Sequence, residues 1–207
     1  MLKKILIIIC AFLLVGCTKT NIDNMSLEEI VTSTIKKESK LYNTNSIGYK
    51  YYLPTEFSVY KEDDFVQELL SHNNSYYLNI DVVSYYYKNN IVSEHDYDDY
   101  EYFTFENKDK NGYLRIRKNS DYFFVELCYN YAIIEVEVKE EDIKYAVSRS
   151  ISILNSIRYN DLVIEKYIND NDLDSSETVY KIPEPKNKNE SKNILEYIEE
   201  YETNEEQ

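Results

Sequence analysis

Between residues 100 and 138, apolar and polar residues alternate in four consecutive runs. The apolar positions are Phe103, Phe105, Leu114, Ile116, Phe123, Val125, Leu127, Ala132, Ile134, Val136 and Val138. Strict alternation is typical of strands with one buried face, and short polar connectors join antiparallel neighbours. The pattern therefore predicts an antiparallel meander over residues 100–138, with Asn111-Gly112 as the sign of a hairpin turn.

Polar side chains fill the alternate positions of the meander: Thr104, Glu106, Arg115, Arg117, Glu126, Glu135 and Glu137. Because side chains at these positions point to the opposite side from the apolar set, we expect them to form a polar outer face. Arg115 and Arg117 are predicted to face Glu126 and Glu135 as exposed cross-strand charge pairs, each of which stabilises the sheet only modestly.

Two amphipathic helices are predicted to flank this sheet. Ser26 and Glu29 have the spacing of a capping box, and a stripe at helical spacing follows: Leu27, Ile30, Val31, Thr34 and Ile35. A second stripe runs from about residue 140 to residue 158 and contains Ile143, Ala146, Val147, Ile151, Leu154 and Ile157. The predicted fold class is therefore α+β, an antiparallel sheet covered on one face by an N-terminal and a C-terminal helix.

The segment between the first helix and the meander contains shorter apolar runs. Residues 49–53 read as a strand that stops at Pro54, and residues 57–60 could extend it. Residues 63–70 fit both a helical turn and a strand, and we favour a strand because residues 71–75 form a loop before an alternating run. That run, residues 76–87, is predicted to be a half-buried strand.

The order of these elements resembles the Mog1/PsbP-like fold. The shared features are a leading helix, an early strand that reaches Leu53-Pro54, an antiparallel sheet and a closing helix, which together cover most of residues 25–158. Members of that fold serve as binding or assembly factors, so the resemblance implies a binding domain. It supplies no functional residues that can be transferred to this chain.

The N-terminus is a signal segment. Lys3 and Lys4 precede an uncharged apolar run, residues 5–15, and the run ends in Leu14-Val15-Gly16-Cys17. This run is shorter than the roughly 20 apolar residues of a membrane-spanning helix, but it suits a signal peptide. An ordinary secretory signal would end in a small-x-small pattern, and an uncleaved anchor would need a longer span.

Leu14-Val15-Gly16-Cys17 resembles the lipobox of bacterial lipoproteins. The resemblance implies cleavage between Gly16 and Cys17 and a diacylglyceryl group on the Cys17 sulfur. Two acyl chains hold a protein stably, so the mature chain would be anchored to the cell membrane on its extracytoplasmic face.

Composition divides the remainder of the chain. We expect a signal peptide at residues 1–16, a lipid-anchored tether at 17–24, an α+β domain at 25–160 and an acidic, largely disordered tail at 161–207, because that last stretch is rich in Asn, Asp, Glu, Lys and Ser. Within the tail, apolar residues at 194, 195, 198 and 201 fit a transient helix or a helix that docks on a partner.

The charge of the mature chain limits its partners. Loss of the two signal lysines leaves 21 basic against 38 acidic side chains, a net charge of −17. Nucleic acid is therefore not expected as a partner, because its binding requires a basic surface, whereas cationic partners are favoured. The abundance of Asn, Lys, Ile and Tyr indicates an AT-rich genome, as in a low-GC Gram-positive bacterium.

Few residues suggest catalysis or metal binding. Cys128 lies in an apolar run and is expected to be a packed thiol, since Cys10 leaves with the signal and Cys17 is lipidated. The best metal candidates are His95, Asp96, Asp98 and Asp99, but they lie in a charged loop without a second histidine nearby, which favours a solvated loop. No phosphate-binding or nucleophile motif occurs, so no cofactor is predicted.

Two functions are compatible with these patterns. The first is a non-enzymatic surface lipoprotein that binds a protein or an envelope glycan, and the many tyrosines would suit such contacts, although strand propensity alone also explains them. The alternative is a cell-envelope hydrolase that uses acidic residues.

Overall fold

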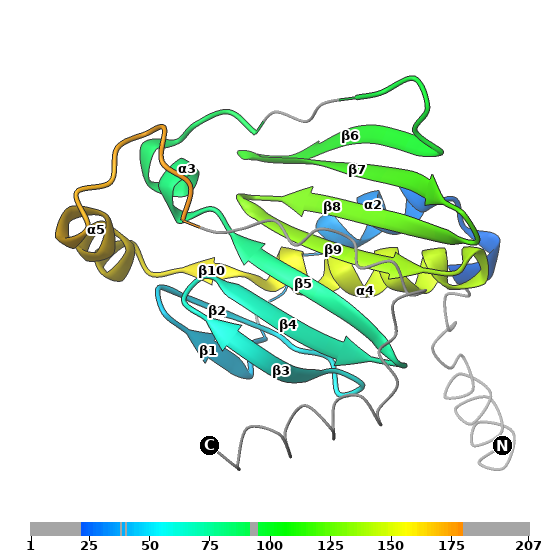
Figure 1. Ribbon diagram of the computed structural model, residues 1–207, viewed down its shortest axis with the longest axis horizontal. Helices are drawn as coiled ribbons and strands as arrows, with labels where there is room; N and C mark the ends of the chain where they lie inside the picture. Colours follow the sequence, from blue (N-terminus) through cyan, green and yellow to red (C-terminus); the bar gives the residue numbers. More distant parts are fainter. Residues whose placement is uncertain (1–21, 38, 40, 92–94, 180–207) are drawn as a thin grey trace, which may run out of the picture.

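The computed structural model describes residues 22–37, 39, 41–91 and 95–179. The lipobox, with Gly16 and Cys17, and the predicted helix near residues 194–201 lie outside these ranges. The fold is α+β, as predicted, with an antiparallel seven-stranded sheet and a smaller three-stranded sheet (Figure 1).

The larger sheet has the strand order β3-β4-β5-β9-β8-β7-β6. Its strands are β3 (Ser58–Asp63), β4 (Val66–Ser71), β5 (Asn74–Ile80), β6 (Glu101–Asn107), β7 (Lys110–Asn119), β8 (Tyr122–Tyr129) and β9 (Ala132–Val138). The predicted meander is confirmed as β6 to β9, and β5 pairs with β9 so that the earlier hairpin continues the same sheet.

Tight turns of residues with positive φ join the strands. Lys108 has φ 59° and turns β6 into β7, so the prediction of a turn at Asn111-Gly112 is wrong. Gly112 instead lies inside β7, where an added Cβ would be 2.2 Å from the Cys128 carbonyl oxygen. Glycine is needed there because the neighbouring backbone approaches closely, not because a turn requires it.

The early strands differ in part from the predictions. Residues 66–71 are a strand, β4, as favoured, whereas the run of residues 57–60 does not extend the strand before Pro54 but begins β3 at the sheet edge. The predicted strand over residues 76–87 is too long. It ends at Ile80, and Asp81 then caps helix α3 (Val82–Tyr87) by accepting a hydrogen bond from the Ser84 backbone N–H at 2.8 Å.

Helices α2 (Leu27–Ile35) and α4 (Ile143–Ser156) cover one face of the larger sheet, as expected (Figure 1). The capping box of α2 is confirmed: the Glu29 backbone N–H donates to Ser26 Oγ, and the Ser26 N–H donates to the Glu29 carboxylate. Helix α4 is shorter than the predicted stripe over residues 140–158, and short 3₁₀ helices η1 (Ile22–Asn24) and η2 (Glu140–Asp142) precede α2 and α4. Buried residues of α4, such as Val147 and Ile151, form the centre of the core.

The smaller sheet has the order β1-β2-β10. Its strands are β1 (Thr44–Ser46), β2 (Tyr49–Tyr51) and β10 (Arg158–Tyr159). The Tyr51 hydroxyl donates a hydrogen bond to the buried Gln67 side chain of β4, which links the two sheets. The predicted strand at residues 49–53 is confirmed as β2, but its partners β1 and β10 were not predicted, because strands of two or three residues show no usable alternation.

The domain continues past the predicted boundary at residue 160. Helix α5 (Asp161–Asp170) is amphipathic, with Ile164 and Ile168 buried in the core and the ring of Tyr167 set edge-on 4.7 Å from that of Phe65. Residues 161–170 therefore belong to the folded domain and not to the tail. The prediction failed because the many charged residues of this segment are typical of disordered chains. The two isoleucines, four positions apart, lie on one face of the helix and pack it against the core.

If α5 is part of the core, Ile164→Ala should lower the free energy of unfolding by about 2–5 kcal/mol, because it removes a buried aliphatic side chain. Leu162→Ala is the matched control, since Leu162 is 77% exposed on the same helix. Urea denaturation followed by far-UV circular dichroism checks both variants. Equal stabilities of the two variants would contradict the assignment of α5 to the core.

Candidate functional site

The outer face of the larger sheet, opposite α2 and α4, carries a row of acidic residues across its strands. The antiparallel registers place Glu68 opposite Tyr77, Tyr77 opposite Glu135, and Glu135 opposite Glu126. We call Glu68, Tyr77, Glu135 and Glu126 the acidic row. Arg115 of β7 follows Glu126 in the same register, and Lys61 of β3 lies opposite Glu68, so a basic residue stands at each end of the row.

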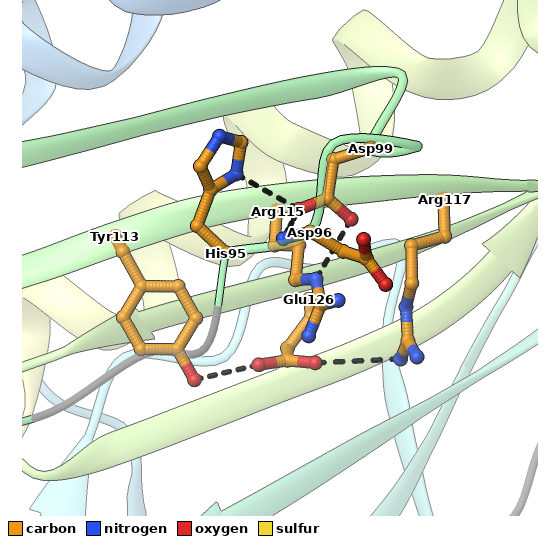
Figure 2. A network of polar contacts seen from close by, with 7 residues as sticks. All are labelled: His95, Asp96, Asp99, Tyr113, Arg115, Arg117 and Glu126. Atoms are coloured by element: carbon orange, nitrogen blue, oxygen red, sulfur yellow. Dashed lines mark hydrogen bonds and ion pairs between the residues drawn. The ribbon is translucent and has the colours of Figure 1, made fainter.

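Asp99 is the best-connected of the predicted metal candidates (Figure 2). One carboxylate oxygen accepts a hydrogen bond from Arg115 Nε at 2.8 Å, and the other lies 3.1 Å from His95 Nδ1 and 3.0 Å from the Asp96 backbone nitrogen. The Asp99 side chain is 1% exposed. Burial opposes its ionisation, but the bonds from Arg115, the Asp96 backbone and His95 outweigh burial and lower the pKa of Asp99.

The other candidates do not converge with Asp99 on one point. Asp96 and Asp98 are exposed, and Asp96 contributes its backbone N–H to Asp99. The imidazole of His95 stacks on the ring of Tyr102, with 4.4 Å between centroids. Among residues 22–37, 39, 41–91 and 95–179, no group of three or more His, Cys, Asp or Glu side chains is arranged to hold a metal ion.

Glu126 has partners for both of its carboxylate oxygens (Figure 2). The Tyr113 hydroxyl donates to Oε1 at 2.6 Å, and Arg117 Nη2 lies 3.6 Å from Oε2. The predicted pairing of Arg117 with Glu126 is thus confirmed. Arg115 lies opposite Glu126 in register, as predicted, but directs its guanidinium to Asp99 of the connector between α3 and β6.

Glu135 is not the exposed ion-pair partner that its sequence position predicts. It is 2% exposed, and its best described contact is a weak hydrogen bond from Asn79 Nδ2 at 3.4 Å. Burial first, and then the negative charge of Glu126, raises the pKa of Glu135 to about 8, against a smaller opposing effect of Arg117. Glu135 is therefore mainly protonated at neutral pH, and Asn79 beside it has a buried Oδ1 without a hydrogen-bond partner.

Cys128 also points to the outer face and is buried, which confirms the expected packed thiol. Burial strongly raises the pKa of its thiol, and the carboxylates of Glu126 and Asp81 add to the effect. A thiol held in its protonated form is a poor nucleophile and a poor metal ligand. Its role in this position is packing.

A groove opens at the other end of the domain, beside the turn between β1 and β2 and the start of α5. Its volume is about 630 Å³, and its lining includes Lys50, Arg158, Asn160, Ile47 and Leu162. Ile47 is 48% exposed and Leu162 is 77% exposed, so the groove has an apolar rim. Exposed apolar side chains grouped around a concave surface are typical of contact sites for other molecules.

Comparisons with protein-family models, with curated proteins and with solved structures found no match. Within the described residues, no helix is both long and apolar enough to span a membrane.

The hydrogen bonds of Asp99 should make it more important for stability than its neighbour. Asp99→Asn removes the charge that faces Arg115 and should cost roughly 1.5–3 kcal/mol, the usual range for hydrogen bonds to charged groups. Asp98→Asn is the control, because Asp98 directly precedes Asp99 and its side chain is exposed. This substitution should cost less than about 0.5 kcal/mol. Chemical denaturation at pH 7 measures both, and a larger loss for Asp98→Asn would contradict the described geometry.

The raised pKa of Glu135 predicts a loss of stability as the pH rises. Because the folded chain retains this proton up to about pH 8, whereas the unfolded chain releases it near 4.5, the stability from Glu135 is complete below 4.5 and is lost between those values. The resulting loss in the free energy of unfolding is on the order of a few kcal/mol, since one pKa unit corresponds to about 1.4 kcal/mol. Glu135→Gln should abolish this loss, because glutamine does not titrate.

Denaturant titrations at pH 5, 6, 7 and 8 test this dependence. Glu165→Gln is the matched control, because Glu165 is an exposed carboxylate of α5, and it should leave the pH profile unchanged. A Glu135→Gln variant with the same decrease in stability as the parent chain would show that another group is responsible.

Proposed function

We propose that this protein is a lipid-anchored surface lipoprotein of a low-GC Gram-positive bacterium, in which a folded α+β domain has a non-enzymatic binding or assembly role at the extracytoplasmic face of the cell membrane. The observation that carries this proposal is the segment Leu14-Val15-Gly16-Cys17 at the end of a short apolar run. The resemblance to a lipobox implies both the compartment and the diacylglyceryl anchor on Cys17.

The position of the first described residues supports a close attachment to the membrane. Four residues separate Cys17 from Ile22, the first residue of η1, and Lys144 Nζ of α4 holds this region by donating to the Asp23 carbonyl oxygen at 2.7 Å. A chain of about five residue steps extends at most roughly 17 Å. A lipid on Cys17 would therefore keep the N-terminal end of α4 close to the bilayer.

The groove beside α5 is suited to meet a partner away from that anchor. Helix α4 begins beside η1, and after its 14 residues the chain enters β10, which lines the groove. A helix of this length spans about 21 Å. The groove thus lies at the opposite end of α4 from the attachment point, and we propose that it contacts a protein or an envelope glycan.

The chemistry of the acidic row supports a binding domain more than the alternative hydrolase. Glu126 and Glu135 are adjacent carboxyl groups, and the raised pKa of Glu135 is a property that acid–base catalysts use. However, both oxygens of Glu126 are already bonded, and Glu135 is buried, so neither is placed to exchange a proton with a substrate. The contacts of Glu126 with Tyr113 and Arg117, and of Glu135 with Asn79, hold both side chains in place on the sheet.

The anchor is tested by Cys17→Ser. The variant should lose a metabolically incorporated fatty-acid label and leave the membrane fraction, because no thiol remains to receive the diacylglyceryl group. Cys10→Ser is the matched control: it changes a cysteine of the predicted signal segment, and the variant should keep both the label and the membrane location. A parent chain without lipid label, or a Cys17→Ser chain that stays membrane-bound, would refute the proposed anchor.

A further inference from the structure

A small cavity lies on the outer face of the larger sheet, beside the start of α3. Its volume is about 210 Å³, and its floor is one row of the antiparallel register, in which Tyr113 of β7 lies opposite Cys128 of β8 and Cys128 lies opposite Ile133 of β9. The walls come from α3, from the segment that follows it and from the turn between β8 and β9: Asp81, Ser84, Asn90, Ile91 and Tyr131. The cavity is thus formed by elements that are far apart in the sequence.

The floor of this cavity is buried, and its rim reaches the solvent. Tyr113 is 7% exposed and Cys128 is 3% exposed, whereas Asn90 is an exposed residue. Small-molecule sites commonly have this form, in which apolar and aromatic walls surround a few polar groups. Sites for drug-sized molecules have volumes of roughly 300–1,000 Å³, so this cavity suits a smaller ligand.

The charge of the lining is negative. Asp81 is the one acidic residue among the described residues that line the cavity, and none of them is basic. Asp81 Oδ1 caps α3 by accepting a hydrogen bond from the Ser84 backbone N–H, and no donor among the described residues is bound to Oδ2. A carboxylate that is partly shielded from water attracts a cation more strongly than a fully solvated one does. The cavity therefore favours a positively charged ligand.

The floor of the cavity also feels this negative charge. Burial first, and then the carboxylates of Glu126 and Asp81, raises the pKa of the Cys128 thiol. Glu126 is held on the sheet by Tyr113 and Arg117, so Asp81 is the acid that can pair directly with a ligand.

Aromatic rings near Asp81 indicate the kind of cation. The face of an aromatic ring attracts an ammonium group, and Lys88 Nζ lies 3.7 Å from the ring centroid of Tyr85 and 6.0 Å from that of Tyr131. Lys88 is exposed and is not one of the lining residues. A metal ion would need several oxygen or nitrogen ligands, whereas an organic ammonium ion needs one carboxylate, aromatic faces and apolar contacts, all of which this lining offers.

We propose that this cavity, which we call the ammonium cavity, binds a small organic ammonium ion. The cationic group lies between Asp81 and the ring of Tyr131, and the apolar part of the ligand lies over Cys128 and Ile133. The ammonium cavity shares no lining residue with the groove beside α5. The inference depends neither on the lipid anchor nor on the partner proposed for that groove.

Calorimetric titration of the full mature protein with choline tests the class of ligand. Choline carries a trimethylammonium group, and 3,3-dimethyl-1-butanol has nearly the same shape with carbon in place of the charged nitrogen. We expect saturable binding of choline and at least about tenfold weaker binding of the alcohol, because an uncharged group gains nothing from the carboxylate of Asp81. The absence of saturable choline binding, or equal binding of the two compounds, would overturn the proposal.

Asp81→Asn tests the proposed counter-ion and keeps the helix cap, because asparagine caps helices about as well as aspartate does. The variant should bind choline at least about tenfold more weakly than the parent chain, since the charge that faces the ligand is lost. Asp121→Asn is the matched control, because it removes the same charge from an exposed side chain in the turn between β7 and β8, at the opposite end of β8 from Cys128. Equal losses in the two variants would show that net charge, and not the ammonium cavity, governs binding.

Backbone amide chemical shifts locate the ligand without any substitution. In the ¹⁵N-labelled parent protein, choline should shift the amide signals of Ser84, Tyr113 and Ile133. It should leave the signals of Lys50 and Leu162, which line the groove beside α5, unchanged. Shifts confined to the groove, or spread evenly over the surface, would refute the location of the site.

Discussion

The packing of α4 against the larger sheet is the interaction on which the rest of the structure depends. The buried centre of the inner face of β5, β9, β8 and β7 is apolar, and a sheet with such a face is unstable until another element covers it. Helix α4 crosses β8 and β9 with buried residues such as Ala146 and Ile151, and α2 packs beside it. Because α4 then leads directly into β10, the same helix also places the smaller sheet and α5 at the end of the core.

The outer face of this sheet is polar but is not simply a solvated surface. Asp99 and Glu126 are each bonded through both carboxylate oxygens, so the acids near Arg115 and Arg117 form a closed network. Glu135 is different, because it is buried, has no ion pair within the described residues and retains its proton near neutral pH. The burial of Glu135 beside Asn79 and the bonded oxygens of Glu126 make these acids part of the sheet's own packing.

Sequence patterns correctly predicted the elements whose formation depends mainly on neighbouring residues in the chain. The alternation of residues 100–138 predicted the four strands of the meander, and the capping box at Ser26 predicted where α2 begins, because both depend on neighbours in the chain. The same reasoning failed where a second signal competed. The alternation of β5 continues through Asp81 and Val82 and concealed the cap of α3, and the charged surface of α5 concealed two core residues.

The sequence by itself determined the α+β class, the strands of the meander, the helix pair and the expectation of a lipid on Cys17, since each of these follows from short-range periodicity or from a contiguous motif. The tertiary structure alone decided which acids share the outer face, that Asp99 binds Arg115, and that Glu135 is buried beside Glu126. The physical reason is that burial and pKa depend on what lies across the sheet and above it, and residues distant in the sequence supply those neighbours.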